Sequence, residues 1–198
     1  MLGTIYLGGP DVFLHNALEV GARKMAICRQ FDFDAAFPFD VDEIEQKKKK
    51  TPEEIFQRNH ASMNAMEIGL FNLTPFRGPS ADAGTIFELG YMLARGKAVF
   101  GYSSCNLTYE ERVAGASQKL RIEDGRAWDQ DNLAVEDHGL SDNLMIVKAI
   151  EDAGGFIEIV EERSSALDIQ LTAFRAFEAC LKKLQMRCIA PGTKSSGA

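Results

Sequence analysis

The chain has 198 residues, of which 45% are hydrophobic and 26% charged, and its formal net charge is -7. This length and apolar content predict one globular domain with a sizeable core, and the acidic balance argues against a nucleic acid partner, because phosphate backbones are bound by clustered Lys and Arg. No apolar run approaches the ~20 residues of a membrane helix, and the four cysteines lack a CxxC spacing. We therefore expect a cytoplasmic protein with reduced thiols and no membrane contact.

The first part of the chain alternates between strand and helix signals. The apolar amino terminus lacks the basic segment of a signal peptide and is predicted to be the first strand. Thr51, Pro52 and Glu54 form a capping box with proline at the first helical position, a strong helix start. The predicted elements are strands over residues 3–7, 34–37 and 65–71 and helices over residues 16–30 and 51–66.

The second part continues the alternation, apart from a long segment over residues 103–139 that is predicted to be irregular and to act as a lid, an interface arm or a solvated insertion. Further elements are a helix that begins at Asp82 and ends near Gly96, strands over 98–102 and 155–160, and helices over 141–152 and 164–184. This pattern predicts an α/β fold with a doubly wound, five-stranded parallel sheet of flavodoxin-like type. We expect a single domain over residues 1–188 and a disordered tail over 189–198.

Two carboxylates, Asp82 and Glu88, lie six residues apart at the start of the predicted helix after the third strand. The loop after a strand's carboxyl end is where open α/β sheets bind ligands. Glu88 would lie near the positive end of the helix dipole, which favours an ionised carboxylate by a few tenths of a kcal/mol. The pair therefore suggests a glycosyl-transfer site, although Asp82 as a simple helix cap and Glu88 as a solvated helix residue would give the same spacing.

Three separated stretches give this pattern a more specific meaning. The stretch TPFRGPSADAGTIFELG resembles the signature of the nucleoside 2-deoxyribosyltransferase family. The amino-terminal IYLGGPDVF resembles that family's first strand and substrate loop, and DNLAVEDHGLSDNLM resembles its late Asn-Leu-Met segment. Together the three stretches span residues 5 to 145 in the family's order, so the resemblance covers most of the chain.

By this resemblance, Glu88 is the nucleophile that attacks the anomeric carbon of a 2'-deoxyribose, Asp82 contacts the sugar beside it, and Tyr6 orients the nucleophile. Cleavage of an N-glycosidic bond builds oxocarbenium character, which a carboxylate can trap as a glycosyl-enzyme. A second nucleobase then attacks the same carbon, and the configuration is retained. The resemblance implies a deoxynucleoside and a free nucleobase as partners, and no cofactor or metal.

The resemblance also implies substrate-binding residues. Gly9 belongs to the substrate loop, Phe13 packs against the base, and Asp40 helps to recognise the base unless it is a plain loop residue. Asn143 and Met145 reach into a neighbouring subunit's site and hold the hydroxyl end of the sugar. The resemblance therefore implies a homo-oligomer, a dimer or larger, with shared active sites.

Asn72 departs from the family pattern. Many members carry an Asp at the corresponding place, where it could protonate the leaving base. A neutral Asn can donate a hydrogen bond but no proton, so the proton donor is unassigned.

Two other functions fit the same residues. One is an N-glycoside hydrolase of 2'-deoxynucleosides or their 5'-monophosphates, with water as the acceptor, although the acid at Asp11 in GGPD favours an unphosphorylated sugar. The other is a nucleotide-binding module without catalysis, since a fold alone does not define a function. The choice between purine and pyrimidine bases is open in the sequence.

Overall fold

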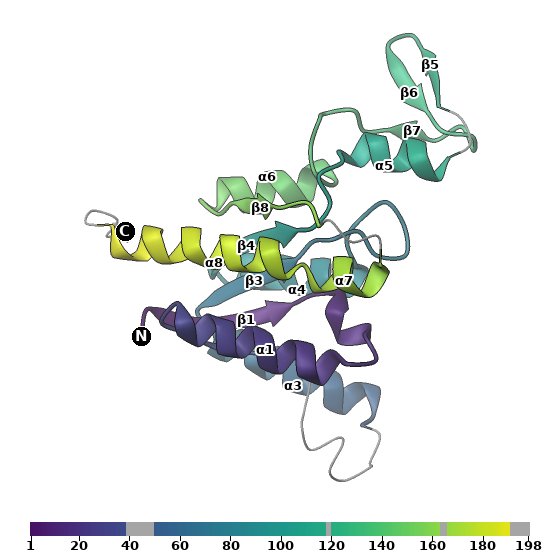
Figure 1. The fold of residues 1–198 in the computed structure, drawn as a ribbon. Coiled ribbons are helices and arrows are strands. Elements are labelled where there is room, and N and C mark those ends of the chain that lie inside the picture. The colour runs from purple at the N-terminus through teal and green to yellow at the C-terminus, as the bar shows by residue number, and fades with distance from the viewer. Residues whose placement is uncertain (39–49, 118–119, 163–165, 191–198) are drawn as a thin grey trace.

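The centre of the molecule is a five-stranded parallel sheet with the strand order β2-β1-β3-β4-β8. The computed structural model describes residues 1–38, 50–117, 120–162 and 166–190 (Figure 1). The sheet strands are β1 (Gly3–Gly8), β2 (Phe33–Ala36), β3 (Ile68–Asn72), β4 (Ala98–Ser103) and β8 (Ile157–Ile159). Because the order runs outward from β1 in both directions, the sheet is doubly wound and flavodoxin-like, which confirms the predicted fold class.

Helices cover both faces of the sheet (Figure 1). One face packs on α1 (Ala17–Gln30) and α8 (Phe174–Ile189), and the other packs on α3 (Pro52–Ala65), α4 (Ala83–Ala94) and α6 (Leu144–Asp152). Successive strand side chains alternate between these two cores, as the twofold period of a strand requires. On β3, for example, Leu70 packs toward α1 and α8, whereas Phe71 packs toward α4.

Two predicted helix starts, at Thr51 and Asp82, are confirmed by their hydrogen bonds. The Thr51 hydroxyl accepts the Glu54 amide at 3.2 Å, and the Glu54 carboxylate accepts the Thr51 amide at 2.7 Å, which completes the capping box of α3. Asp82 caps α4 through the Thr85 amide at 2.8 Å. These caps set where the two helices that flank the candidate site begin.

The helix predicted over residues 164–184 is wrong as a single element. The structure has α7 (Leu167–Thr172), then a break at Ala173, and then α8, which continues to Ile189. Ala173 adopts φ 47 and ψ 36, a left-handed conformation that ends a helix and that L-residues adopt at a cost of roughly 1–2 kcal/mol. Residues 164–165 and the predicted disordered tail beyond Ala190 lie outside the described residues.

The segment predicted to be irregular contains regular structure. It holds α5 (Tyr109–Ala116) and a three-stranded antiparallel sheet of β5 (Arg121–Glu123), β6 (Arg126–Trp128) and β7 (Ala134–Val135). The turn between β5 and β6 is formed by Asp124 and Gly125, both with positive φ, as a tight hairpin needs. This small sheet projects from the body of the molecule (Figure 1), so the segment is an arm.

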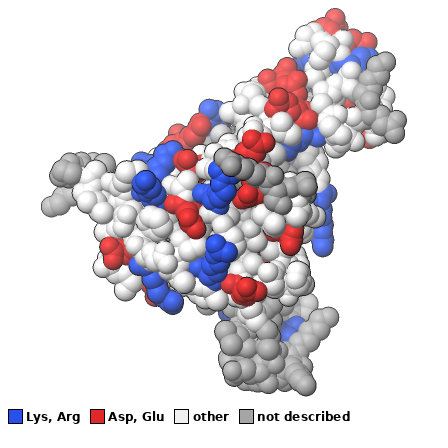
Figure 2. Space-filling view, in the orientation of Figure 1, with Lys and Arg blue, Asp and Glu red and all other residues white. Residues whose placement is uncertain are grey.

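The surface charges are mixed. On the face drawn in Figure 2, Lys and Arg are interspersed with Asp and Glu over the helices rather than gathered in one basic patch. Within the described part of the chain, no helix is both long and apolar enough to cross a membrane. The single domain over residues 1–188 stays a prediction.

Candidate active site

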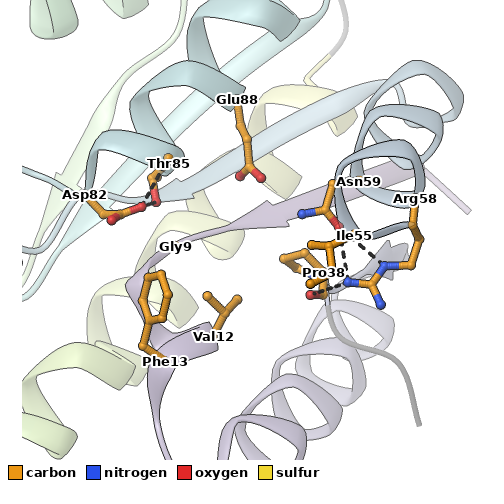
Figure 3. Close-up of a pocket in the computed structure, with 11 residues that line it drawn as sticks. Gly9, Val12, Phe13, Pro38, Ile55, Arg58, Asn59, Asp82, Thr85 and Glu88 are labelled. Carbon is orange, nitrogen blue, oxygen red and sulfur yellow. Dashed lines mark hydrogen bonds between the residues drawn. The ribbon is translucent and has the colours of Figure 1, made fainter. Parts of the chain in front are cut away.

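A pocket of about 280 Å³ opens at the carboxyl ends of β1 and β3, beside the short helix η1 (Pro10–Phe13) (Figure 3). In a doubly wound sheet this is the point where the strand order reverses and ligands bind. Helix α4 supplies the carboxylate side of the pocket and α3 supplies a wall on the other side. The lining residues are Gly9, Val12, Phe13, Pro38, Ile55, Arg58, Asn59, Asp82, Gly84, Thr85 and Glu88.

Glu88 points from the second turn of α4 into this pocket (Figure 3). The Tyr6 hydroxyl, fully buried under the pocket, donates a hydrogen bond to Glu88 Oε1 at 2.8 Å. The pKa of Glu88 is raised to about 7, mainly because the side chain is buried. The charge of Asp82 also raises this pKa, whereas the hydrogen bond from Tyr6 and the side chain of Asn59 lower it. Burial is the largest of these effects, and Glu88 is poised between its two protonation states near neutral pH.

Asp82 is both a helix cap and a pocket residue. Its Oδ2 accepts hydrogen bonds from the amide of Thr85 at 2.8 Å and from the Thr85 hydroxyl at 3.0 Å. Its Oδ1 accepts no hydrogen bond from the described part of the chain. The cap fixes the carboxylate at the pocket wall and leaves one oxygen for a ligand hydroxyl.

The loop after β1 brings Gly9 and Phe13 to the pocket. A Cβ at Gly9 would lie 2.6 Å from the Cβ of Asn72, so no side chain fits there. Phe13 is 56% exposed and stacks on Phe76, with ring centroids 5.1 Å apart and planes at 8°. The guanidinium of Arg77 lies over both rings, so Phe13 is an accessible aromatic face with a fixed orientation.

Asn72 does not line the pocket, contrary to the substrate-binding role expected for it. It is fully buried behind Gly9, and its amide nitrogen donates to the carbonyl of Leu171 at 2.7 Å and to Asp11 Oδ1 at 3.4 Å. Its Oδ1 accepts the amide of Thr74 at 3.1 Å. The cause is strand alternation, since Asn72 follows Leu70 toward α1 and α8 and away from Glu88.

The other predicted substrate residues are not brought into this pocket. Asn143 caps α6, where its Oδ1 accepts the amide of Met145 at 3.0 Å and its amide nitrogen donates to Glu136 at 2.6 Å. Met145 is 69% exposed. Their role in the site of a neighbouring copy stays a prediction. Asp40 lies outside the described residues.

Arg58 and Asn59 on α3 are pocket residues that were not predicted from the sequence. The guanidinium of Arg58 donates to the carbonyl of Pro38 at 3.0 Å and to Asn59 Oδ1 at 3.3 and 3.4 Å. Because the Asn59 oxygen faces Arg58, its amide nitrogen faces the pocket and Glu88 (Figure 3). The spacing of Ile55 and Asn59, one helical turn apart, could have indicated a common pocket-facing side of α3.

The polar side chains that line this pocket are the carboxylates of Asp82 and Glu88, the amide of Asn59, the hydroxyl of Thr85 and the guanidinium of Arg58. Among residues 1–38, 50–117, 120–162 and 166–190, no three His, Cys, Asp or Glu side chains are grouped to hold a metal ion. The chemistry that the lining residues can supply is nucleophilic and electrostatic.

The fold and the pocket define a doubly wound α/β protein with two carboxylates at the strand-reversal point, a constellation suited to chemistry at a sugar carbon. A family model described as nucleoside 2-deoxyribosyltransferase matches residues 5–145. The chain belongs to the nucleoside 2-deoxyribosyltransferase family.

Individual proteins are also similar to this chain. The chain is 32% identical over 197 residues to the uncharacterized protein C191.05c of Schizosaccharomyces pombe, covering 92% of this chain and 89% of that protein. Among solved structures it is similar to a 2-desoxiribosyltransferase from Leishmania mexicana, with 25% identity, a TM-score of 0.57 and coverage of 89% and 97% of the two chains. A conserved protein from Enterococcus faecalis shares the fold, with 18% identity, a TM-score of 0.53 and coverage of 94% and 99%.

Proposed function

We propose that this protein transfers 2-deoxyribose between nucleobases through a covalent glycosyl-enzyme on Glu88. The observation that carries the proposal is the Glu88 carboxylate, largely buried in the pocket and held by the Tyr6 hydroxyl at 2.8 Å. Membership of the nucleoside 2-deoxyribosyltransferase family supports the same chemistry. The enzyme would be a pentosyl transferase that acts in nucleoside salvage.

In the first half-reaction, an oxygen of ionised Glu88 forms a bond to the anomeric carbon as the N-glycosidic bond breaks. The electron pair of that bond leaves with the base nitrogen, and the positive charge that develops on the sugar is stabilised by the neighbouring carboxylates. The free Oδ1 of Asp82 accepts a sugar hydroxyl and holds the ring over Glu88. A deoxyribose, which lacks an electron-withdrawing 2'-oxygen, forms this cation more readily.

The leaving base would be assisted by Asn59 rather than by Asn72. The amide nitrogen of Asn59 faces the pocket, whereas the side chain of Asn72 is engaged behind Gly9. A neutral amide donates a hydrogen bond to an acceptor atom of the base but transfers no proton. The proton that the base finally carries would come from solvent.

In the second half-reaction, a nitrogen of the incoming base bonds to the same carbon as the bond to Glu88 breaks, and the N–H proton of that base passes to solvent. The Glu88 carboxylate is regenerated and the configuration is retained. The test is incubation of a 2'-deoxynucleoside with a different free base, with the new nucleoside and the released base quantified separately. Formation of the exchanged nucleoside supports a transferase. Base release at a rate that does not depend on the acceptor base would instead indicate an N-glycoside hydrolase.

The charge of the pocket favours a neutral substrate, but for a different reason from the one expected. Asp11 is 1% exposed and bonded to Lys24, so it does not face the pocket. Two carboxylates, Asp82 and Glu88, and one guanidinium, Arg58, line the pocket, so acidic groups outnumber basic groups there and disfavour an added anion. We therefore propose an unphosphorylated deoxynucleoside as the substrate, with Asn143 and Met145 completing the site of a neighbouring copy in a homo-oligomer.

The rate of exchange should depend on the ionisation of Glu88. Only ionised Glu88 can attack. Because the pKa of Glu88 is raised to about 7, the ionised fraction of Glu88 falls as the pH drops below 7. We expect kcat/KM to rise about tenfold per pH unit below pH 7 and to level off above it. Steady-state assays between about pH 5 and pH 9 measure this, and a profile that is flat over that range would contradict the role of Glu88.

Replacing Tyr6 by Phe should slow exchange and move this profile. The hydroxyl of Tyr6 lowers the pKa of Glu88 by donating to the carboxylate, so its loss raises that pKa further. We expect the rising limb to shift to higher pH and kcat/KM at pH 7 to fall roughly tenfold to a hundredfold, the effect of one hydrogen bond to a charged group.

A matched control is Tyr91→Phe. The Tyr91 hydroxyl also donates to a side chain, Asn64 Oδ1 at 2.7 Å, but on the exposed surface between α3 and α4. This variant should keep the parent pH profile. An equal shift in both variants would mean that Tyr6 acts only through general packing.

A further inference from the structure

The segment after β1, residues 9–13, is called the pocket loop below. A buried group of polar side chains with no role in the proposed chemistry lies beneath it. The ammonium of Lys24, on α1, donates to Asp11 Oδ2 at 2.6 Å and to the Tyr102 hydroxyl at 2.8 Å. Lys24 is 0%, Asp11 1% and Tyr102 1% exposed. The ammonium also lies 5.1 to 5.8 Å from the ring centroids of Tyr102, Phe174 and Phe177.

The group extends from the ion pair to the end of β3 and to α7. The second oxygen of Asp11 accepts a hydrogen bond from the Asn72 amide at 3.4 Å, and that amide also donates to the carbonyl of Leu171 at 2.7 Å. Asp11 is therefore bonded to α1 through Lys24 and to the sheet through Asn72. The Asp11 carboxylate thus links η1 directly to α1 and β3, and Lys24 and Asn72 extend the link to β4 and α7.

A stability role alone explains this arrangement poorly. Two charges lose their hydration when buried, and a buried ion pair is often no more stabilising than apolar residues of the same volume. Burial lowers the pKa of Lys24, and the charge of Asp11 acts in the opposite direction. A short, charge-assisted bond does have one property that apolar packing lacks, which is a fixed direction and length.

The position of Asp11 in the chain indicates which segment the bond between Lys24 and Asp11 would hold in place. Asp11 lies inside η1, between Gly9 on one side and Val12 and Phe13 on the other, and these three neighbours line the pocket opposite Glu88. Asp11 itself faces away from the pocket, into the group of Lys24 and Asn72. A shift of Asp11 would move the pocket loop as a unit.

We propose that Lys24 and Asp11 are positioning residues that hold η1 in register with Glu88, so that the loop presents Gly9 and Phe13 to the substrate. This inference rests on the proposed function of the pocket. It assigns the ion pair to substrate placement, and the chemistry at the sugar carbon remains with Glu88.

The test compares a neutralised pair with the parent. Lys24→Met alone leaves an unpaired buried carboxylate and is expected to unfold at a lower temperature. The double variant Asp11→Asn with Lys24→Met removes both charges at nearly constant volume and should recover much of the melting temperature. It should still show a KM for the deoxynucleoside raised about tenfold or more, with a smaller change in kcat, because a displaced loop weakens binding.

Hydrogen exchange gives a readout that does not need turnover. Amides of residues 8–16 in the double variant should exchange faster than in the parent, while those of β3 and β4 keep the parent rates. A matched control is Lys183→Met with Glu158→Gln, a more exposed pair at 3.0 Å that should change neither KM nor this exchange.

A double variant with the parent KM and the parent exchange over residues 8–16 would overturn the positioning role. If the parent protein exchanged no bases, the proposed function would fail, yet the amide exchange of the loop would still decide whether the pair holds it. The two failures are thus distinguishable.

Discussion

Replacing Glu88 by Gln is expected to abolish base exchange, with a fall in kcat of about a thousandfold or more, as for other covalent nucleophiles. Gln keeps the shape of the side chain and can still accept the hydrogen bond from Tyr6, but its amide cannot form the glycosyl ester. The measurement is the rate of appearance of exchanged nucleoside at saturating acceptor base. Exchange at the parent rate would remove Glu88 from the mechanism.

The same variant should be more stable than the parent at alkaline pH, which separates lost chemistry from lost folding. Because the folded pKa of Glu88, about 7, lies above its ordinary value of 4.5, stability that is present below pH 4.5 is lost as the pH rises through 7. Gln does not titrate, so at about pH 8.5 the variant should gain roughly 1–3 kcal/mol in unfolding free energy and at about pH 4 almost none. Urea unfolding at the two pH values measures the difference.

Replacing Asn72 by Asp should destabilise the fold, even though family resemblance suggested a carboxylate at this position. The two donors of the Asn72 amide would become an acceptor that faces the carboxylate of Asp11 and the carbonyl of Leu171. We expect a loss of about 3 kcal/mol or more at neutral pH, the cost of an uncompensated buried charge. The loss should shrink as the pH falls, since a protonated Asp regains one donor.

The control for this variant is Asn59→Asp. It makes the same chemical change on α3, in a pocket-lining and less buried position, so the unfolding free energy should change by less than about 1 kcal/mol. The new carboxylate beside Glu88 should raise the pKa of Glu88 and move the pH profile of exchange upward. Equal stability of Asn72→Asp and the parent would contradict the buried network.

Much of the fold could be predicted from local signals. The apolar strands, the Thr51 capping box and the Asp82 cap marked the alternation that builds the sheet, and their contacts are local in sequence. The break at Ala173 could not be read in the same way, because alanine favours a helix and the left-handed turn is imposed by tertiary packing. Helix α5 was missed, although Thr108 and Glu111 form a capping box that signals its start.

The candidate site was only partly predictable. The spacing of Asp82 and Glu88 indicated the carboxylate pair, and the structure brings both to one pocket. The wall of the pocket opposite the carboxylates includes Asn59 on α3, far from them in the sequence. Which side of α3 faces α4 depends on how the two helices pack on the same face of the sheet. Asn72 lies outside this pocket, and strand alternation from Leu70 could have indicated that it faces α1 and α8.

The glycosyl-enzyme on Glu88 can be detected by mass spectrometry of the intact protein and its peptides. The protein is quenched in acid during turnover of a 2'-deoxynucleoside without acceptor base. We expect a deoxyribosyl adduct on the peptide that contains Glu88, its disappearance when an acceptor base is added, and no adduct in Glu88→Gln. An adduct on another residue, or an equal adduct in Glu88→Gln, would show that Glu88 is not the nucleophile.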